Sequence, residues 1–477
     1  MRDGAIASDD RADALPGGLH PRSAVDGIRW PGLPGTGDAL ALALLFQLAH
    51  SERWPAERIA ALQLRQIEAL IAHAMATVPF YRDRLRAAGV GGAALTLESF
   101  RRIPILTRAE LQEAGPALLS RAVPKDHGAV GAAQSSGSTG RPVSVAITAV
   151  TRLVNQAINM RVHRWHGRDF RAKSGAIVAM ASPAAAQAAA EGRPARWALG
   201  YLSGPMVQFD ILRPLAEQLA WLAREEPRYL LTYPTNLRAL LEMARAEGVR
   251  PKRLEQVATI AESGDADLPA LCREVWGVPA LDIYSARETG ILAAQCGDGR
   301  PYHLHPEAAY VEILDEAGRP REAGETGRVV VTVLHNFAMP LIRYDIGDYA
   351  EAGGACPCGR ALPTLARIVG RKRNMFVLPS GERFWPFAFK VGALNAIAPI
   401  RQIQLVQKTT RRIEVRLVAP RPLDGSQQAR LRAHLASVIG HPFEFDIVPV
   451  AAIPRSAGGK YEDYISEVET EMQGSRR

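Results

Sequence analysis

Apolar residues recur every three or four positions from about Ala39 to Gly89, and this spacing predicts helix. The repeating positions include Leu62, Ile67, Leu70, Ile71 and Ala74. The segment Pro79-Phe80-Tyr81-Arg82 breaks the repeat, which then resumes from Arg82 to Ala88. We therefore expect long helices with a break at this proline.

Two shorter helices are predicted at Leu97 to Phe100 and at Arg108 to Glu113. Thr96 and Thr107 directly precede them, and threonine is a frequent N-cap residue. Thr107 and Glu110 also have the spacing of a capping box, in which two side chains satisfy backbone N–H groups reciprocally. Both helices should therefore begin directly after their threonine.

Short apolar runs then alternate with helical ones. The strand-like runs are Ala176 to Met180, Tyr229 to Thr232, Val257 to Ala261 and Ala280 to Tyr284. The helical runs among them are Pro214 to Arg224 and Asn236 to Gly248. This alternation predicts an α/β core with a substantial parallel sheet.

After Tyr284 the pattern changes to that of antiparallel strands. Tyr310 to Leu314 and Arg328 to Leu334 are extended runs, separated by turns at Gly318 and Gly324. From about Gly370 a smaller β-β-α-β unit is predicted. Its elements are a hairpin of Ile400 to Gln407 with Arg412 to Val418, a helix at Ser426 to Ile439 and a strand at Phe443 to Val448. We expect a flexible tail over residues 1–35, a large domain over 36–370 and a small domain over 371–477.

Composition refines this picture only slightly. The chain has 477 residues, of which 47% are apolar and 22% charged, so it suits a globular protein of more than one domain. The net charge of +9 comes from scattered arginines without interleaved aromatic residues, which indicates a solvated basic surface and no nucleic-acid partner. A basic surface also helps to attract an anionic substrate.

The chain carries no evident membrane or secretion signal. Its longest apolar run, Ala39 to Ala49, is about half of the roughly 20 residues that a spanning helix needs. The segment Met1 to Leu19 contains four aspartates and no apolar core after a basic start, unlike a signal peptide. Four cysteines in so long a chain do not form a disulfide scaffold. We therefore expect a cytoplasmic protein.

A glycine- and hydroxyl-rich segment is the first candidate site. It reads Ser135, Ser136, Gly137, Ser138, Thr139, Gly140, Arg141 and Pro142. Glycines allow successive backbone N–H groups to converge on an anion, and the hydroxyls add donors, so the segment suits phosphate groups. It lacks the Gly-Lys-Ser/Thr ending of a Walker loop. Taken alone, such a segment is more often a solvent-exposed loop.

Four further segments follow it in order. Tyr284 and Glu288 lie in Tyr284-Ser285-Ala286-Arg287-Glu288-Thr289-Gly290, and Asp348 ends Leu341-Ile342-Arg343-Tyr344-Asp345-Ile346-Gly347-Asp348. Arg371 follows Gly370, and Lys460 ends Pro454-Arg455-Ser456-Ala457-Gly458-Gly459-Lys460. Individually, these residues could be loop caps or exposed turn residues. Together they form an ordered set across more than 300 residues.

This set resembles the adenylate-forming superfamily of acyl-CoA synthetases and adenylation domains. The chain looks like the phenylacetate–CoA ligase branch and its capsule-biosynthesis-type relatives. The segments that carry this closer resemblance are Val78-Pro79-Phe80-Tyr81-Arg82, Ile103-Pro104-Ile105-Leu106-Thr107 and Ala338-Met339-Pro340-Leu341-Ile342-Arg343-Tyr344. The resemblance spans about residues 60 to 465. It implies an α/β fold with mixed sheets, flanking helices and a small β-rich, barrel-like part, followed by a small mobile α+β domain.

The resemblance also implies roles for the site residues. Ser135 to Thr139 would hold the β- and γ-phosphates of ATP, and Glu288 would bind Mg²⁺, a hard ion that prefers carboxylate oxygen. Tyr284 would stack on adenine, Asp348 would bind the ribose hydroxyls, and Arg371 would contact the nucleotide. Lys460 would bridge the substrate carboxylate and the α-phosphate. Rotation of the small domain would then expose the adenylate to an acceptor.

The implied activity is ATP-dependent activation of an aromatic or otherwise planar carboxylic acid, with coenzyme A as the acceptor. The alternative acceptor is an amine, a carrier protein or another nucleophile, and monomer and homodimer both stay open. A catalytically inactive binding protein is disfavoured, because Glu288, Asp348 and Lys460 are all present. One departure concerns the hinge: family members usually carry acidic residues after Gly-Arg, whereas this chain has Lys372-Arg373-Asn374.

A cysteine and histidine cluster predicts a second, metal-binding site. Cys296, His303, Cys356 and Cys358 would supply three thiolates and an imidazole to a structural Zn²⁺. Some phenylacetate–CoA ligases have such a set in this region, although Cys-x-Cys is tighter than the usual spacing. His305 is an alternative ligand, and free thiols are the other interpretation. Separately, Trp165, His166 and Tyr233 are candidates for lining the acid pocket.

Overall fold

The computed structural model describes residues 21, 23–28, 30–91, 94–134, 143–180, 195–198, 203–262, 267–297, 301–386, 394, 396–455 and 459–468. Its helices are α1 (Thr36–Ser51), α2 (Ala56–Thr77), α3 (Pro79–Ala87), α4 (Leu97–Arg101), α5 (Arg108–Ala114), α6 (Ala149–Trp165), α8 (Leu215–Glu225), α9 (Pro234–Glu247), α10 (Leu268–Trp276) and α12 (Gly425–Ile439). Three short 3₁₀ helices are η1 (Gly115–Leu118), η2 (Lys125–His127) and η3 (Lys372–Asn374).

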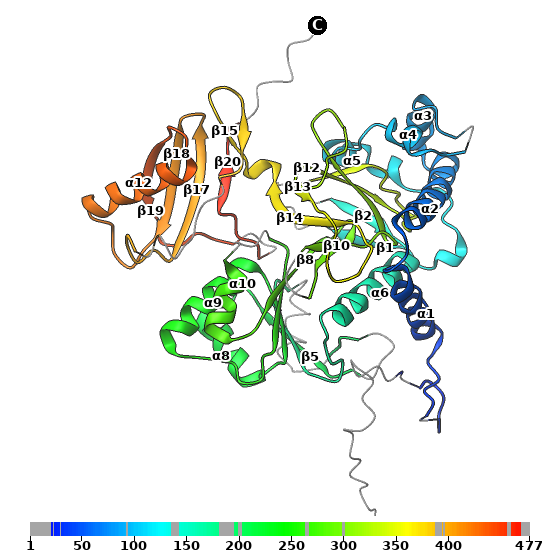
Figure 1. Ribbon diagram of the computed structural model, residues 1–477, viewed down its shortest axis with the longest axis horizontal. Coiled ribbons are helices and arrows are strands. Elements are labelled where there is room, and N and C mark those ends of the chain that lie inside the picture. Colours follow the sequence, from blue (N-terminus) through cyan, green and yellow to red (C-terminus); the bar gives the residue numbers. More distant parts are fainter. Residues whose placement is uncertain are drawn as a thin grey trace, which may run out of the picture.

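A twelve-stranded mixed sheet forms the centre of the molecule (Figure 1). Its order is β11 (Ala309–Leu314), β12 (Thr326–Val333), β13 (Tyr344–Ala352), β14 (Thr364–Arg371), β10 (Tyr302–Leu304), β9 (Gly290–Gln295), β8 (Ala280–Ala286), β7 (Gln256–Ile260), β6 (Tyr229–Thr232), β3 (Ser174–Val178), β5 (Pro205–Asp210) and β4 (Ala195–Arg196). The strands from β5 to β8 are parallel, and the pairs from β8 to β11 are antiparallel. The expected α/β fold with mixed strands is therefore confirmed, and pairing through β9 and β10 joins both parts into one sheet.

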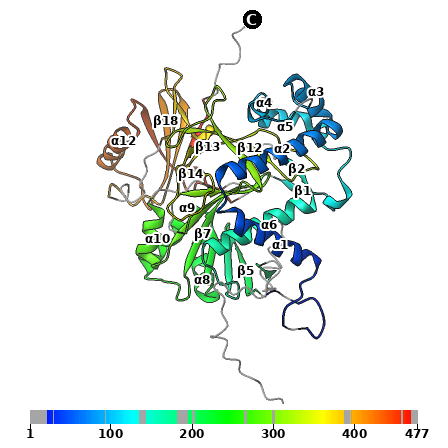
Figure 2. The same cartoon turned by 45° about the vertical axis from the view of Figure 1, so that its right-hand side comes forward.

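Helices cover both faces of the parallel strands (Figures 1 and 2). Side chains alternate between faces along a strand, so Val257 packs with α8, α9 and α10 whereas Ala258 packs with Val162 of α6. Helix α1 lies outside α6, where Leu48 contacts the Ala157 and Ile158 positions. Burial on both faces explains why these strands are continuous apolar runs.

Helices α4 and α5 begin where the sequence predicts, whereas α3 begins at Pro79 and not at Arg82, so the predicted break over residues 79–82 is wrong. Thr96 caps α4 and Thr107 caps α5, and both form capping boxes, the latter with Glu110. Proline stands at the start of α3, since its missing N–H has no partner to lose in a first turn. Helices α2 to α5 pack their apolar faces against the antiparallel end of the large sheet. None of the described helices combines the length and apolarity needed to cross a membrane.

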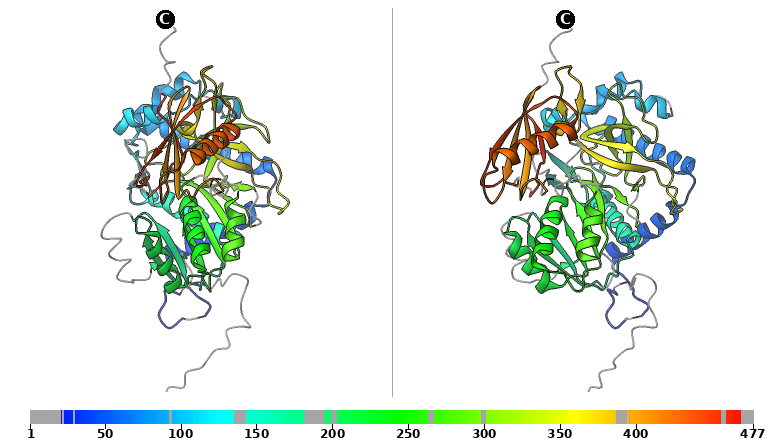
Figure 3. Two further views of the ribbon diagram at one scale, coloured as in Figure 1. Left: turned by 90° about the vertical axis from the view of Figure 1, so that its left-hand side faces the viewer. Right: turned by 60° about the vertical axis from the view of Figure 1, so that its left-hand side comes forward.

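A second, smaller sheet follows β14 (Figure 3). It has four strands in the order β19 (Glu444–Pro449), β18 (Arg412–Val418), β17 (Gln402–Thr409) and β20 (Tyr464–Ser466). Strands β17 and β18 form the predicted hairpin, and Leu431 and Leu435 of α12 pack onto them. The sequence pattern missed β20, as well as a two-stranded ribbon of β15 (Phe376–Val377) and β16 (Arg383–Phe384).

Candidate active site

Tyr284 and Asp348 meet although 64 residues separate them in the chain. Tyr284 lies near the end of β8, and its hydroxyl donates a 2.8 Å hydrogen bond to Oδ2 of Asp348 on β13. Arg371 is the cross-strand partner of Asp348, with Nε 3.3 Å from Oδ1. Burial and the nearby Asp348 raise the pKa of Tyr284 well above its usual value, so this hydroxyl stays a donor.

Glu288 lies in the turn between β8 and β9, and its side chain is only 5% exposed. One of its oxygens is 3.7 Å from a guanidinium nitrogen of Arg108, the first residue of α5. A buried carboxylate at this position has the oxygen chemistry of a magnesium ligand. Sequence analysis placed Arg108 in a helix but gave it no role, because its proximity to Glu288 depends on the packing of α5 against β13.

Lys460 stands among the other predicted residues. Burial lowers the pKa of its amine, and the neighbouring positive charge of Arg371 lowers it further. Asp348, Glu262 and Glu288 act in the opposite direction, so three carboxylates also face this lysine. The fold thus brings together Tyr284, Glu288, Asp348, Arg371 and Lys460 from three strands or their ends and from the C-terminal segment.

The segment Ser135 to Pro142, which includes the whole predicted phosphate loop, lies outside the described residues. The strands on either side of it are described: β1 (Gly131–Gln134) pairs antiparallel with β2 (Ser144–Ile147). Arg287 donates a 3.3 Å hydrogen bond to the carbonyl oxygen of Gln134. The chain therefore enters this segment beside the neighbour of Glu288.

Glu262 and Arg455 are site residues that sequence reasoning did not single out. Glu262 follows β7, and its side chain is 4% exposed and within 3.5 Å of Arg455. Tyr233, a candidate pocket residue, lies beside Gly459: a Cβ atom at that glycine would be 3.2 Å from Cε2 of Tyr233. The sequence motif that ends at Lys460 includes Arg455, but Glu262 belongs to no recognised motif. The ion pair between Glu262 and Arg455 could therefore not be predicted from the sequence.

The four predicted zinc ligands form one cluster. Ligand atoms of Cys296, His303, Cys356 and Cys358 all lie within 4.8 Å of one another. Zinc–sulfur bonds of about 2.3 Å hold tetrahedral ligand atoms roughly 4 Å apart, so the residues fit this ion. Burial raises the pKa of Cys358, but hydrogen bonds from Arg360 and the neighbouring thiols lower it overall, which favours a thiolate ligand.

Cys296 follows β9, His303 lies on β10, and Cys356 and Cys358 lie in the loop before β14. These three segments are neighbours because β10 pairs with both β9 and β14. Cys272 is elsewhere, on the buried face of α10, where burial raises the pKa of its thiol to about 12. His305, the alternative ligand, is not in the cluster: its Nδ1 is 2.6 Å from a guanidinium nitrogen of Arg161.

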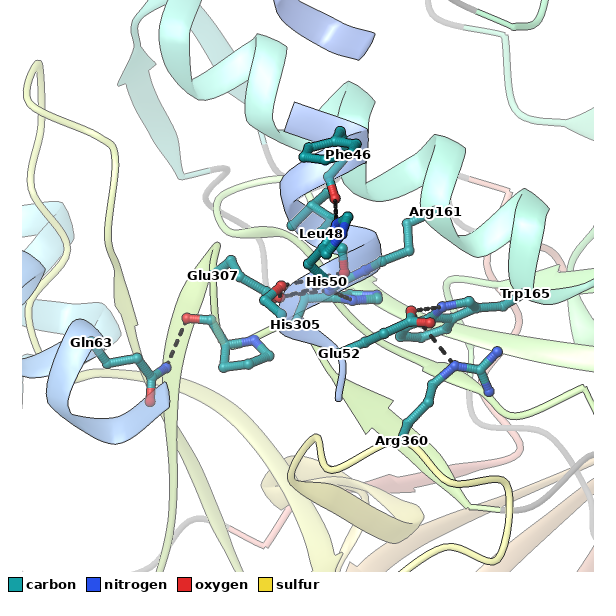
Figure 4. Close-up of polar contacts among 12 residues, drawn as sticks. Phe46, Leu48, His50, Glu52, Gln63, Arg161, Trp165, His305, Glu307 and Arg360 are labelled. Atoms are coloured by element: carbon teal, nitrogen blue, oxygen red, sulfur yellow. Dashed lines mark hydrogen bonds and ion pairs between the residues drawn. The ribbon is translucent and has the colours of Figure 1, made fainter. Parts of the chain in front are cut away.

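Polar contacts connect the C-terminal end of helix α1 to Trp165 and Arg360 (Figure 4). Glu52, which caps α1, accepts a 2.6 Å hydrogen bond from Trp165 and lies 3.7 Å from Arg360. Arg360 in turn donates to the sulfur atoms of Cys296 and Cys358. The Trp165 ring also contacts the His303 ring, with centroids 5.7 Å apart. Trp165 thus contacts His303 and Arg360 beside the cluster, and it also stacks on His305.

His166 likewise bonds the carbonyl oxygen of Gln295, the residue before Cys296, at 3.0 Å. Its pKa is lowered to about 3 by burial and by Arg168. The ring is therefore neutral, and its described hydrogen bond joins the end of α6 to the last residue of β9. Of the three candidate pocket residues, Tyr233 is therefore the one whose described contacts reach the Lys460 segment.

Lys460 and Arg371 lie with the carboxylates of Asp348, Glu262 and Glu288 at strand ends, and this set of charges is suited to a nucleotide and a magnesium ion. The class this defines is a nucleotide-binding enzyme, and the chain belongs to the family of AMP-binding enzymes, whose model matches residues 59–338. The resemblance noted in the sequence is confirmed at this level.

Relatives with assigned names support the same placement. The chain is 26% identical over 453 residues to a phenylacetate–coenzyme A ligase of Thermus thermophilus, covering 86% of this chain and 96% of the relative. It is 25% identical to a phenylacetate–coenzyme A ligase of Escherichia coli, covering 84% and 93%. The fold is similar to 2-hydroxyisobutyryl-CoA ligase in the postadenylation state with 2-HIB-AMP, with a TM-score of 0.71, 22% identity and coverage of 88% and 92%.

Proposed function

We propose that this enzyme is an ATP-dependent ligase that activates an aromatic carboxylic acid as its acyl-adenylate and passes the acyl group to coenzyme A. The observation that carries the proposal is the position of Lys460 among Asp348, Glu288 and Arg371. The names of the phenylacetate–coenzyme A ligase relatives support the aromatic substrate class and the acceptor.

In the first step an oxygen of the acid attacks the α-phosphorus of ATP, and pyrophosphate leaves. The two reacting groups are both anions, so fixed positive charge must be present before they meet. The Lys460 ammonium lies between the acid and the α-phosphate and offsets charge that develops on the phosphoryl oxygens. Its lowered pKa reflects the cost of burial, and the three carboxylates around it help to keep it protonated.

The remaining residues hold the nucleotide. Asp348 accepts hydrogen bonds from the ribose hydroxyls, and the Tyr284 hydroxyl orients Asp348. The Tyr284 ring stacks on the adenine. Arg371 contacts the nucleotide close to the start of the small domain. Glu288 would hold the Mg²⁺ that accompanies ATP, and that ion would supply charge neutralisation at the phosphates. Ser135 to Thr139 hold the outer phosphates.

ATP–pyrophosphate exchange tests this proposal, because it measures adenylate formation alone. A panel of aromatic and aliphatic acids should contain at least one that supports exchange. Lys460→Ala should then reduce the rate by roughly 100-fold or more, as expected for loss of a charge contact in the transition state. Lys408→Ala is the matched control, since Lys408 forms an exposed ion pair with Glu467 on the same domain. Exchange by Lys460→Ala at the wild-type rate would overturn the role.

A second acceptor class is favoured by one observation. The residues after Arg371 are Lys372, Arg373 and Asn374, where relatives of this type usually carry an acidic hinge residue. Purified adenylate should be converted to a thioester when coenzyme A is added. If the adenylate persists with coenzyme A but is consumed by an amine or a carrier protein, the enzyme belongs to the alternative class.

We also propose that the cluster of Cys296, His303, Cys356 and Cys358 holds one structural Zn²⁺. Four protein ligands complete a tetrahedral shell and leave no position for substrate, so the ion would supply no chemistry to the reaction. Its contribution would be to fix the loop between β13 and β14 against β9 and β10.

The proposed domain limits are 36–370 and 371–477, with residues 1–35 as a tail. Arg371 is the last residue of β14, and η3 begins at Lys372, so the chain leaves the large sheet at this boundary. None of the four cysteines, all of which the structure describes, forms a disulfide, which supports a reducing compartment, and we assign the enzyme to the cytoplasm.

A further inference from the structure

The segment that carries Lys460 is held on the large domain by one buried carboxylate, Glu262. Its Oε1 accepts a 2.6 Å hydrogen bond from the backbone N–H of Tyr461 and lies 3.5 Å from Arg455. These two residues flank Lys460 on either side. In Figure 1 the small domain (orange to red) lies directly above the layer of α9 and α10 (green).

The other oxygen of Glu262 is anchored within the large domain. Oε2 accepts hydrogen bonds from the backbone N–H of Thr235 at 3.1 Å and from its hydroxyl at 2.7 Å. Thr235 lies in the first turn of α9, where free N–H groups and the helix dipole favour an anion. This oxygen therefore keeps its partners whether or not the Lys460 segment is present.

The backbone before Glu262 has an unusual conformation. Ala261 has φ of +77°, a left-handed value that is costly for a residue with a side chain. It comes directly after β7, so it turns the chain at the carboxyl end of a parallel strand, where ligands of such sheets bind. The strain directs Glu262 toward α9 and the C-terminal segment.

Arg455 completes the junction. One of its guanidinium nitrogens donates to the hydroxyl oxygen of Thr235 at 2.9 Å and to the carbonyl oxygen of Gly459 at 3.0 Å. Gly459 itself fits against the large domain: its φ is +74°, and a Cβ atom would be 2.6 Å from Cγ2 of Ile211. The lysine segment thus docks through a charge pair, a backbone hydrogen bond and a close backbone approach.

We propose that Glu262 is the docking residue for the Lys460 segment, a positioning residue that serves adenylate formation and is not needed for transfer to the acceptor. This inference rests on the proposed function. Glu262 does not touch the reacting atoms; it sets where Lys460 stands. When the small domain moves, Glu262 loses Tyr461 and Arg455 but keeps Thr235, so undocking does not leave a buried carboxylate without hydrogen bonds.

The test is a comparison of the two half-reactions in Glu262→Gln. Pyrophosphate exchange should fall about tenfold to 100-fold, mainly in kcat, because a charge-assisted contact is lost. Conversion of added adenylate should stay within about twofold of wild type, and the melting temperature should change little. The matched control is Glu255→Gln: Glu255 precedes β7 as Glu262 follows it, and it forms an exposed ion pair with Arg228.

Two further variants separate docking from a general effect on folding. Arg455→Met combined with Glu262→Gln should cost little more than either change alone, because both remove the same contact. Gly459→Ala should also slow exchange, since its Cβ would meet Ile211. Gly440→Ala is its control: Gly440 has a similar φ of +70°, but its Cβ would meet nothing within 4 Å.

Hydrogen exchange gives a readout that needs no activity. The amides of residues 459–466 should exchange faster in Glu262→Gln than in wild type and Glu255→Gln. Faster amide hydrogen exchange in Glu262→Gln, together with a wild-type enzyme that activates no acid, would keep the docking inference and overturn the proposed function. Unchanged amide protection, unchanged pyrophosphate exchange, or equal slowing of both half-reactions would overturn the docking inference.

Discussion

The hydroxyl of Tyr284 donates a 2.8 Å hydrogen bond to Asp348, and this contact joins the parallel and antiparallel parts of the large sheet at the site. Asp348 also has Arg371 at 3.3 Å on its other oxygen. The carboxylate is thus fixed from both sides, with the tyrosine and the arginine on strands that are not neighbours in the sheet. In the proposed function, a group held in this way would bind ribose hydroxyls without rearrangement.

Tyr284→Phe should therefore weaken nucleotide binding. Removing the hydroxyl deletes one charge-assisted hydrogen bond, a contribution of about 1.5–3 kcal/mol, and leaves Asp348 less well oriented. We expect the KM for ATP in pyrophosphate exchange to rise by about tenfold, with kcat changed much less. Arg371 still satisfies Asp348, so the melting temperature should stay within a few degrees. An unchanged KM for ATP would show that this hydrogen bond has no part in nucleotide binding.

Glu312→Gln should destabilise the fold far more than it affects the site. Glu312 and Arg343 form a two-bond ion pair, at 3.0 and 3.2 Å, and each side chain is only 4% exposed. Removing one partner leaves the guanidinium buried without its counter-charge, which costs about 3–5 kcal/mol. Urea unfolding measures this loss directly.

The control for that variant is Glu351→Gln. Glu351 pairs with Arg367 between β13 and β14, and the arginine is 56% exposed. An exposed pair contributes at most about 1 kcal/mol, so the unfolding midpoint should move little. Equal destabilisation by the two variants would contradict the assignment of Arg343 to the fold.

Arg343 also belongs to one of the sequence motifs that were informative. The segments around Tyr81, Leu106 and Arg343 carried the resemblance to phenylacetate–CoA ligases, and they pack on one another. The Tyr81 hydroxyl bonds the carbonyl oxygen of Pro340, and Leu106 exchanges backbone hydrogen bonds with Arg343 and Asp345. These motifs could be recognised in sequence, although their shared role is to hold β13 in place.

Local structure was predictable because its causes are local. The Thr107 and Glu110 capping box and the β17–β18 hairpin depend on residues within one turn or one ribbon. The Glu262 contact with Tyr461 spans 199 residues, and no periodicity or spacing specifies it. The same reason applies to the pairing of β10 with β14, which brings the cysteine segments together. Long-range contacts depend on strand order, and strand order was not evident from the pattern.

Zinc content is expected to be about one ion per chain in protein purified without a metal-affinity column. Cys358→Ser should reduce it to near zero, because its sulfur is 3.2 Å from Nε2 of His303 in the cluster. Cys356→Ser should lower the melting temperature and yield, with little change in ATP affinity. Acidification and strong chelators should release the metal, since the ligand thiols must be deprotonated.

Cys272→Ala is the control for the metal measurement. Cys272 is on the buried face of α10 and outside the cluster, so this variant can lose stability but should keep its zinc. Wild-type protein without zinc, in which all four thiols react with a thiol reagent while the fold persists, would rule out the site.

Asp282 should make stability depend on pH in the weakly acidic range. Burial raises the pKa of this carboxyl from 3.8 to about 6, against the hydrogen bonds from Thr259 and Tyr302 that favour its charged form. The folded state therefore holds a proton that the unfolded state has already released between about pH 4 and pH 6. Stability from this group is greatest below pH 4, is lost as the pH rises to about 6 and is constant above that.

Asp282→Asn removes this titration. Measured against wild type, the free energy of unfolding of the variant should rise by roughly 3 kcal/mol from pH 4 to pH 6.5 and then level off, whatever the offset at pH 4. Asp315→Asn should show the opposite slope at lower pH, because hydrogen bonds from Arg319 lower the pKa of Asp315. Urea unfolding at half-unit pH steps distinguishes the two. A constant difference between Asp282→Asn and wild type across this window would mean that Asp282 ionises in the folded protein as it does in the unfolded chain.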